Sequence, residues 1–192
     1  MEEYPPMKSR QFVLYAVVVG AFTSLIALSI FAQQDKYSVK VPGGLAFSEF
    51  KGYESWQVIS VSHNGNKVAA ILGNPEMIDA YKSGIPDNGR PFPDGAKMAK
   101  IHWNAVKSET YPGEPTVPGA LHDVDFMAKD SKRFADSGGW GYGAFEYEAA
   151  SNSFRPGNSS DRPPQENNAK CGYACHTSVQ KRDYVFTSYG PR

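Results

Sequence analysis

The sequence predicts an α+β domain made mainly of antiparallel β-sheet, with a few short helices. Several short segments alternate apolar and polar residues, turn-forming residues separate them, and few segments show the apolar period of a helix. The chain has 192 residues, which is enough for one domain with a substantial core. We therefore expect a single folded domain that follows an apolar N-terminal helix.

The segments that predict strands lie at residues 56–62, 67–72, 97–107, 121–128 and 140–147; the first and third alternate in residue type, and the last is rich in aromatic residues and glycine. Asn64 and Gly65 predict a hairpin turn between the first two strands. Asn74 as a cap and Pro75 at the first helical position predict a helix that ends near Ser83. Further helical segments are expected at residues 130–135 and around the cysteines, and loops at residues 85–95, 111–118 and 152–168.

The N-terminal apolar segment covers residues 12–31 and contains no charged side chain. Lys8 and Arg10 precede it, which is the order found in secretory signals, and its length also suits a membrane-spanning helix. Residues 1–32 are thus either a cleaved signal peptide or a retained anchor, and residues 33–42 a linker. In both cases residues 43–192 form a domain exported to the periplasm.

The charge balance argues against nucleic acid as a partner. Lys and Arg number 20, Asp and Glu number 20, and the formal net charge is zero. A basic surface is what nucleic-acid binding normally requires. A small molecule or an electron-transfer partner fits this composition better.

The most informative segment joins two cysteines and a histidine near the C-terminus. Cys171 and Cys175 are the only cysteines, and His176 follows the second one directly. Two thiols with an adjacent imidazole are the groups that attach a c-type haem and ligate its iron, although the usual spacing has two residues between the cysteines and not three. A plain disulfide is the alternative, and zinc is disfavoured because four ligands are needed.

Three ordered sequence blocks resemble one known family. The first is Pro93-Asp94-Gly95 followed by Lys100, the second is 129–134 followed by Gly139-Trp140, and the third is the haem segment followed by 183–187. From about Gly43 to the C-terminus the chain resembles the cytochrome P-460 family and its relative cytochrome c′-beta. The resemblance implies a mainly antiparallel β domain that commonly forms homodimers.

The resemblance also implies roles for particular residues. Cys171 and Cys175 would hold haem c through thioether bonds, His176 would be the proximal iron ligand, and Lys100 would form a further covalent bond to the porphyrin. Lys97 lies an odd number of residues before Lys100 and so belongs to the opposite face of the strand. Family members oxidise hydroxylamine, whereas the c′-beta relatives bind small gases without turnover; both need an open sixth position on the iron.

Three function classes therefore stay open: hydroxylamine oxidation, with electrons passing to a periplasmic cytochrome; binding of nitric oxide; and simple electron transfer. Glu146 is the predicted base in the distal pocket. His102 shares the predicted face of Lys100, and it would close the site if it ligated iron. Two features depart from the family: the extra residue between the cysteines, and Ala69 where hydroxylamine-oxidising members can carry arginine.

Overall fold

The computed structural model describes residues 35–39, 44–157 and 170–192. The predicted N-terminal helix at residues 12–31 lies outside these residues, as do parts of the predicted linker and of the predicted loop at 152–168. Within the described parts of the chain, no helix is both long and apolar enough to cross a membrane.

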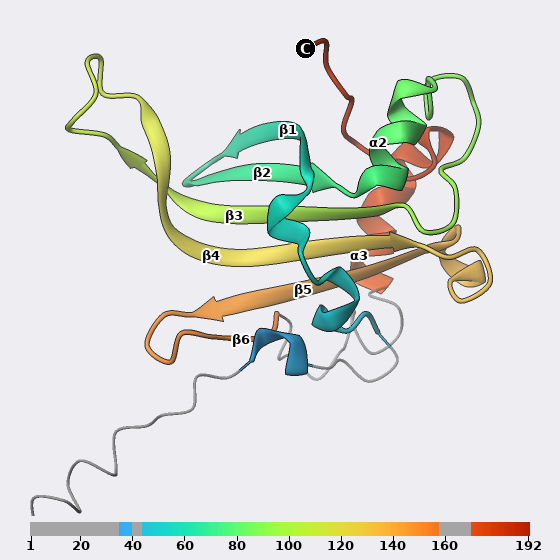
Figure 1. The fold of residues 1–192 in the computed structure, drawn as a ribbon, viewed down its shortest axis with the longest axis horizontal. Helices are drawn as coiled ribbons and strands as arrows, with labels where there is room; N and C mark the ends of the chain where they lie inside the picture. Colours follow the sequence, from blue (N-terminus) through green and yellow to red (C-terminus); the bar gives the residue numbers. More distant parts are fainter. Residues whose placement is uncertain (1–34, 40–43, 158–169) are drawn as a thin grey trace, which may run out of the picture. The chain divides into compact units, whose positions relative to one another are not determined.

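Six antiparallel strands form one sheet in which every strand pairs with its neighbours in sequence (Figure 1). The strands are β1 (Gln57–Asn64), β2 (Lys67–Gly73), β3 (Lys97–Lys107), β4 (Thr116–Lys129), β5 (Trp140–Glu148) and β6 (Ser153–Pro156). The hairpin between β3 and β4 extends from the end of the sheet opposite α2 (Figure 1). This meander confirms the α+β class with a mainly antiparallel sheet.

The described helices are short and lie outside the sheet. They are α2 (Pro75–Lys82), α3 (Lys170–His176) and the 3-10 helices η1 (Lys36–Ser38), η2 (Phe47–Phe50), η3 (Tyr53–Ser55), η4 (Ala135–Ser137) and η5 (Thr177–Arg182). The Asn74 side chain accepts a hydrogen bond of 3.1 Å from the Met77 amide and so caps α2. Gly84 then adopts a φ of 88°, which ends the helix as the sequence predicts.

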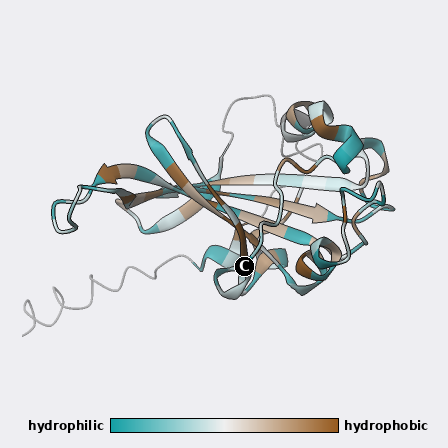
Figure 2. Cartoon of the chain, turned by 90° about the horizontal axis from the view of Figure 1, so that it is seen from above, coloured by the Kyte–Doolittle hydropathy of each residue, from teal (hydrophilic) through white to brown (hydrophobic). Residues whose placement is uncertain are grey.

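Each face of the sheet carries its own hydrophobic core. On one face, aromatic residues of η2 and η3 cover the strands, and Phe50 stacks on Phe126 with ring centroids 4.0 Å apart. On the other face, α2 and the C-terminal segment cover Met98, Met127 and Tyr142. Hydrophobic residues lie along the strands (Figure 2), and the buried ones occupy both faces of the sheet, as packing on both sides requires.

Some expected elements differ from the structure. β6 lies within the predicted loop at 152–168, β4 begins at Thr116 rather than at residue 121, and η2 and η3 were not expected. Residues 131–134 form turns, and the predicted helix at 130–135 is replaced by the later 3-10 helix η4. β6 has only four residues and ends at a proline, so its pairing with β5 and not its own pattern defines it.

Candidate functional site

One face of the sheet carries polar residues next to its apolar core. On β3, Met98, Lys100 and His102 share this face because side chains alternate along a strand. The register places Asp125 opposite Lys100 and Asp123 opposite His102, and it places Tyr142 opposite Met127. The sequence pattern correctly assigned Lys100 and His102 to the same face.

His176 lies at the end of α3, beside this face. Its Nδ1 atom is 2.6 Å from the carbonyl oxygen of Tyr184. A carbonyl oxygen only accepts hydrogen bonds, so Nδ1 carries the proton and Nε2 keeps its lone pair. The imidazole lies between two aromatic rings, with centroid distances of 5.0 Å to Tyr142 and 4.8 Å to Phe186.

The surroundings of His176 favour the neutral imidazole. Burial lowers its pKa, and the positive charge of Lys100 lowers it further, against the opposing effect of the bond to Tyr184. A neutral imidazole with a free Nε2 is the form that binds a metal ion. His176 therefore needs no change of tautomer or protonation state to bind a metal ion.

Helix α3 holds both cysteine positions and packs closely on β5. Residues four apart share one side of a helix, so the positions of Cys171 and Cys175 lie one turn apart on the same side. The Cys175 thiol is free and exposed, whereas nothing is described for the side chain of Cys171. A Cβ atom on Gly172 would lie 2.9 Å from Tyr142, so only glycine allows this approach.

Lys100 and Lys97 extend from opposite faces of β3, as the sequence predicts. The ammonium of Lys97 donates a 2.7 Å hydrogen bond to the Glu49 carbonyl, on the face covered by η2. Lys100 is half-buried, and its charge affects the pKa of both His176 and Asp125. Lys100 thus lies between the imidazole of α3 and the acidic residues of β4.

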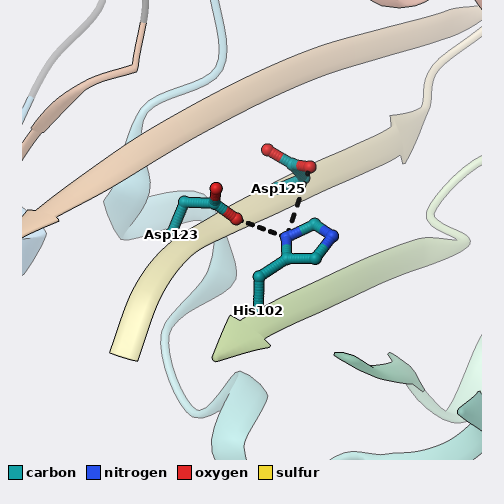
Figure 3. A group of neighbouring side chains, drawn as sticks. All are labelled: His102, Asp123 and Asp125. Atoms are coloured by element: carbon teal, nitrogen blue, oxygen red, sulfur yellow. Dashed lines mark ion pairs between the residues drawn. The ribbon is translucent and has the colours of Figure 1, made fainter. Parts of the chain in front are cut away.

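Beyond Lys100, the side chains of His102, Asp123 and Asp125 point toward one another (Figure 3). His102 Nδ1 forms an ion-pair contact with Asp123 and lies 3.7 Å from Asp125 Oδ2. Burial opposes ionisation of Asp123, but contacts from His102, Lys67 and His122 lower its pKa to about 2. Crowding of the Asp125 carboxyl by protein, and then the charge of Asp123, raise the pKa of Asp125.

These three side chains offer ligand atoms within 4.8 Å of one another. Lys67 Nζ is 3.2 Å from the second oxygen of Asp123, and Lys100 lies opposite Asp125. The two ammonium groups already balance the two carboxylates, so this cluster needs no metal ion for charge compensation. We interpret it as a polar wall of the site.

Glu146 lies on β5 opposite Asp123, and its carboxylate forms an ion pair with Arg155 of β6. The predicted base therefore belongs to the polar face, next to His102 and Asp123, but its carboxylate is already paired with the Arg155 guanidinium. This partner could not be predicted from the sequence, because Arg155 falls in a segment predicted to be a loop.

A family model of cytochrome P460 matches residues 50–187, which is more than half of the chain. The chain belongs to the cytochrome P460 family. A search of curated proteins found no match. The cofactor of this family is haem c with its iron, and the residues described above fit that group.

The fit of this cytochrome P460 chain to haem c rests on the proton of His176 and on the geometry of α3. The thiols of Cys171 and Cys175 would hold the porphyrin from one side of the helix, and the free Nε2 of His176 would reach the iron. The exposed side chain of Phe186, 53% accessible, lies beside the imidazole and offers an apolar contact for a porphyrin.

Sequence reasoning missed several residues of the site. Tyr142, Asp123 and Asp125 lie at alternate positions of predicted strands, so their face follows from β periodicity once the register is known. The Tyr184 carbonyl is a backbone group, and no side-chain pattern identifies it.

Proposed function

We propose that this protein oxidises hydroxylamine, or a related small nitrogen compound, at an open iron site of its haem c. The observation that carries this proposal is the arrangement around His176. A neutral imidazole, whose Nδ1–H donates a hydrogen bond to a backbone carbonyl, lies beside a sheet face that carries Lys100, His102 and carboxylates. One side of the iron would thus have a protein ligand, and polar residues would remain for the substrate.

The proposed roles follow from position. Cys171 and Cys175 hold the porphyrin, His176 ligates the iron, and Lys100 forms the additional bond to the porphyrin. The haem iron, when bound, accepts the electrons of the oxidation. Asp125 lies directly opposite Lys100 on β4, so the side chains of these two residues project from the same face of the sheet.

Oxidation of hydroxylamine also releases protons, so a base is needed. Glu146 is the proposed proton acceptor, and it shares its face with His102 and Asp123. The ion pair with Arg155 orients the Glu146 carboxylate. Replacing Glu146 with Gln should lower kcat by about 10²-fold or more, as is typical for loss of a general base, while haem attachment stays intact.

Binding of nitric oxide without turnover is the second candidate, and Ala69 favours it. Ala69 is buried directly opposite His102, so no cationic side chain stands at the position where hydroxylamine-oxidising relatives can carry arginine. A pocket without that cation would still admit a small gas.

Steady-state turnover separates the two candidates. Holoprotein from a host that matures c-type haem is mixed with hydroxylamine and an artificial electron acceptor. Reduction of the acceptor supports the enzyme, with the Cys171→Ser and Cys175→Ser double variant as a haem-free control. High-spin iron that takes up nitric oxide but shows no turnover would refute oxidation and support the binding protein.

The same proposal has three further parts: the protein is exported to the periplasm, it forms a homodimer, and a periplasmic cytochrome accepts its electrons. The apolar segment at residues 12–31 and the family resemblance support them. Fractionation of cells that express the full chain tests export, because haem-bearing protein should appear in the periplasm if the segment is cleaved and in the membrane if it is kept.

A further inference from the structure

Three segments that are distant in sequence meet next to the backbone that holds His176. They are the end of β4 at Lys129, the turn at Gly138, and Asp183 with Tyr184 after η5. The second and third sequence blocks that resemble the family contain Lys129, Asp183 and Tyr184. Residues from two separate family-like blocks thus contact one another beside the backbone that holds His176.

Lys129 and Asp183 form a buried, fully bonded ion pair. The Lys129 ammonium is 2.8 and 2.9 Å from the two oxygens of Asp183, and it donates a 2.9 Å bond to the Gly138 carbonyl. The Phe92 amide donates to Asp183 as well, at 2.8 Å. The exposed fractions of the two side chains are 6% and 11%. Such a pair fixes geometry, because every donor of the ammonium is used.

The backbone that this pair holds has an unusual conformation. Asp183 and Tyr184 have φ values of 49° and 64°, in the left-handed region that disfavours residues other than glycine. Gly138 leaves room for the Tyr184 ring, because a Cβ atom there would lie 2.2 Å from it. This conformation directs the Tyr184 carbonyl oxygen toward His176, where it accepts a hydrogen bond from Nδ1 with the two atoms 2.6 Å apart.

We propose that Lys129 and Asp183 are positioning residues for His176, and that they set the electron donation of the imidazole to the haem iron through the Tyr184 carbonyl. A short hydrogen bond from Nδ1 makes an imidazole a stronger donor, which stabilises ferric over ferrous iron. The proposal rests on His176 being the iron ligand, as proposed above.

The test compares Asp183→Asn with the double variant Lys129→Met and Asp183→Asn, both as holoproteins. The reduction potential is measured by spectroelectrochemistry, and the iron–histidine stretch of the ferrous protein by resonance Raman. Both variants should show an upward shift of the potential and a lower stretching frequency. The double variant removes both buried charges, so its stability should partly recover while its potential stays shifted.

Arg133→Gln is the matched control. It breaks the 2.7 Å ion pair with Glu49, and the hydrogen bonds of the Arg133 guanidinium reach Glu49 and Gly44 rather than Asp183 or Tyr184, so the potential and the stretch should not change. Wild-type values in the Asp183→Asn protein and in the double variant would overturn the proposal and leave the pair a structural element. A wild-type holoprotein without any iron–histidine stretch would instead refute the ligation by His176, and with it the proposed function.

Discussion

His176 and His102 differ in what holds their Nδ1 atoms. The acceptor for His176 is a backbone carbonyl, which fixes a proton on Nδ1, while burial lowers the pKa and so favours the neutral imidazole with a free Nε2. The neighbours of His102 are the carboxylates of Asp123 and Asp125. The Nδ1 atom of His102 is therefore already engaged by carboxylates of the neighbouring strand. We therefore assign the iron to His176 and not to both histidines.

Replacing His102 with Ala should leave the ferric spin state of the holoprotein unchanged, because His102 is not expected to ligate iron. Electron paramagnetic resonance of the ferric protein measures this directly. His122→Ala serves as the control, since His122 also contacts Asp123 but is more exposed. A wild-type protein that is low-spin and becomes high-spin in His102→Ala would show that the site is closed, as in an electron carrier.

At the scale of elements, the contact between α3 and β5 decides where the haem segment lies. Gly172 lies between the two cysteines of α3 and closely approaches Tyr142 of β5, where a Cβ atom would overlap the tyrosine.

Gly172→Ala tests this contact. The new Cβ would overlap Tyr142, and such overpacking costs about 1–3 kcal/mol, against a gain of up to about 1 kcal/mol in helix propensity. We expect a net loss of roughly 1 kcal/mol in the free energy of unfolding, measured in urea. Gly190→Ala, where nothing lies within 4 Å, should change it by less than about 0.5 kcal/mol. Equal stability of the two variants would contradict the close packing.

Five of the six strands were predictable because two of them alternate in residue type, and the others follow from a hairpin turn or from residues that favour strands. β6 and the 3-10 helices were not, because they depend on partners from elsewhere in the chain. The same limit applies to the site. The cysteine and histidine motif predicted Cys175 and His176, and the family resemblance predicted Lys100, whereas the ion pair of Glu146 with Arg155 and the carbonyl of Tyr184 became visible only with the fold.

In the molecule as a whole, the two faces of the sheet differ in what they carry. One face is packed with aromatic rings and supplies stability, and the other carries the site next to the core around α2 and the C-terminal segment. Tyr81 links this second core to the C-terminus through a 2.9 Å hydrogen bond with Thr187. Burial raises the pKa of Tyr81 from 10.0 to about 12.

This shift predicts a loss of stability at high pH. The raised pKa means that the folded protein favours the protonated phenol, so its contribution is complete below pH 10.0 and disappears as the pH rises through about 12. Tyr81→Phe should lower stability by about 1 kcal/mol at pH 9 because its hydrogen bond is lost. Its further loss between pH 10 and 12 should be smaller than in the wild type, measured by urea unfolding. Parallel curves for the two proteins would contradict this role of Tyr81.

The most direct test of the whole account is a protease digest of the holoprotein, read by mass spectrometry. We expect haem on a peptide that contains Cys171 and Cys175, joined also to the peptide of Lys100, and no bond to Lys97 on the opposite face. Replacement of Lys100 by Arg should release the second peptide and leave the first one attached. A peptide in which Cys171 and Cys175 are bonded to each other and carry no haem would contradict the account at its centre.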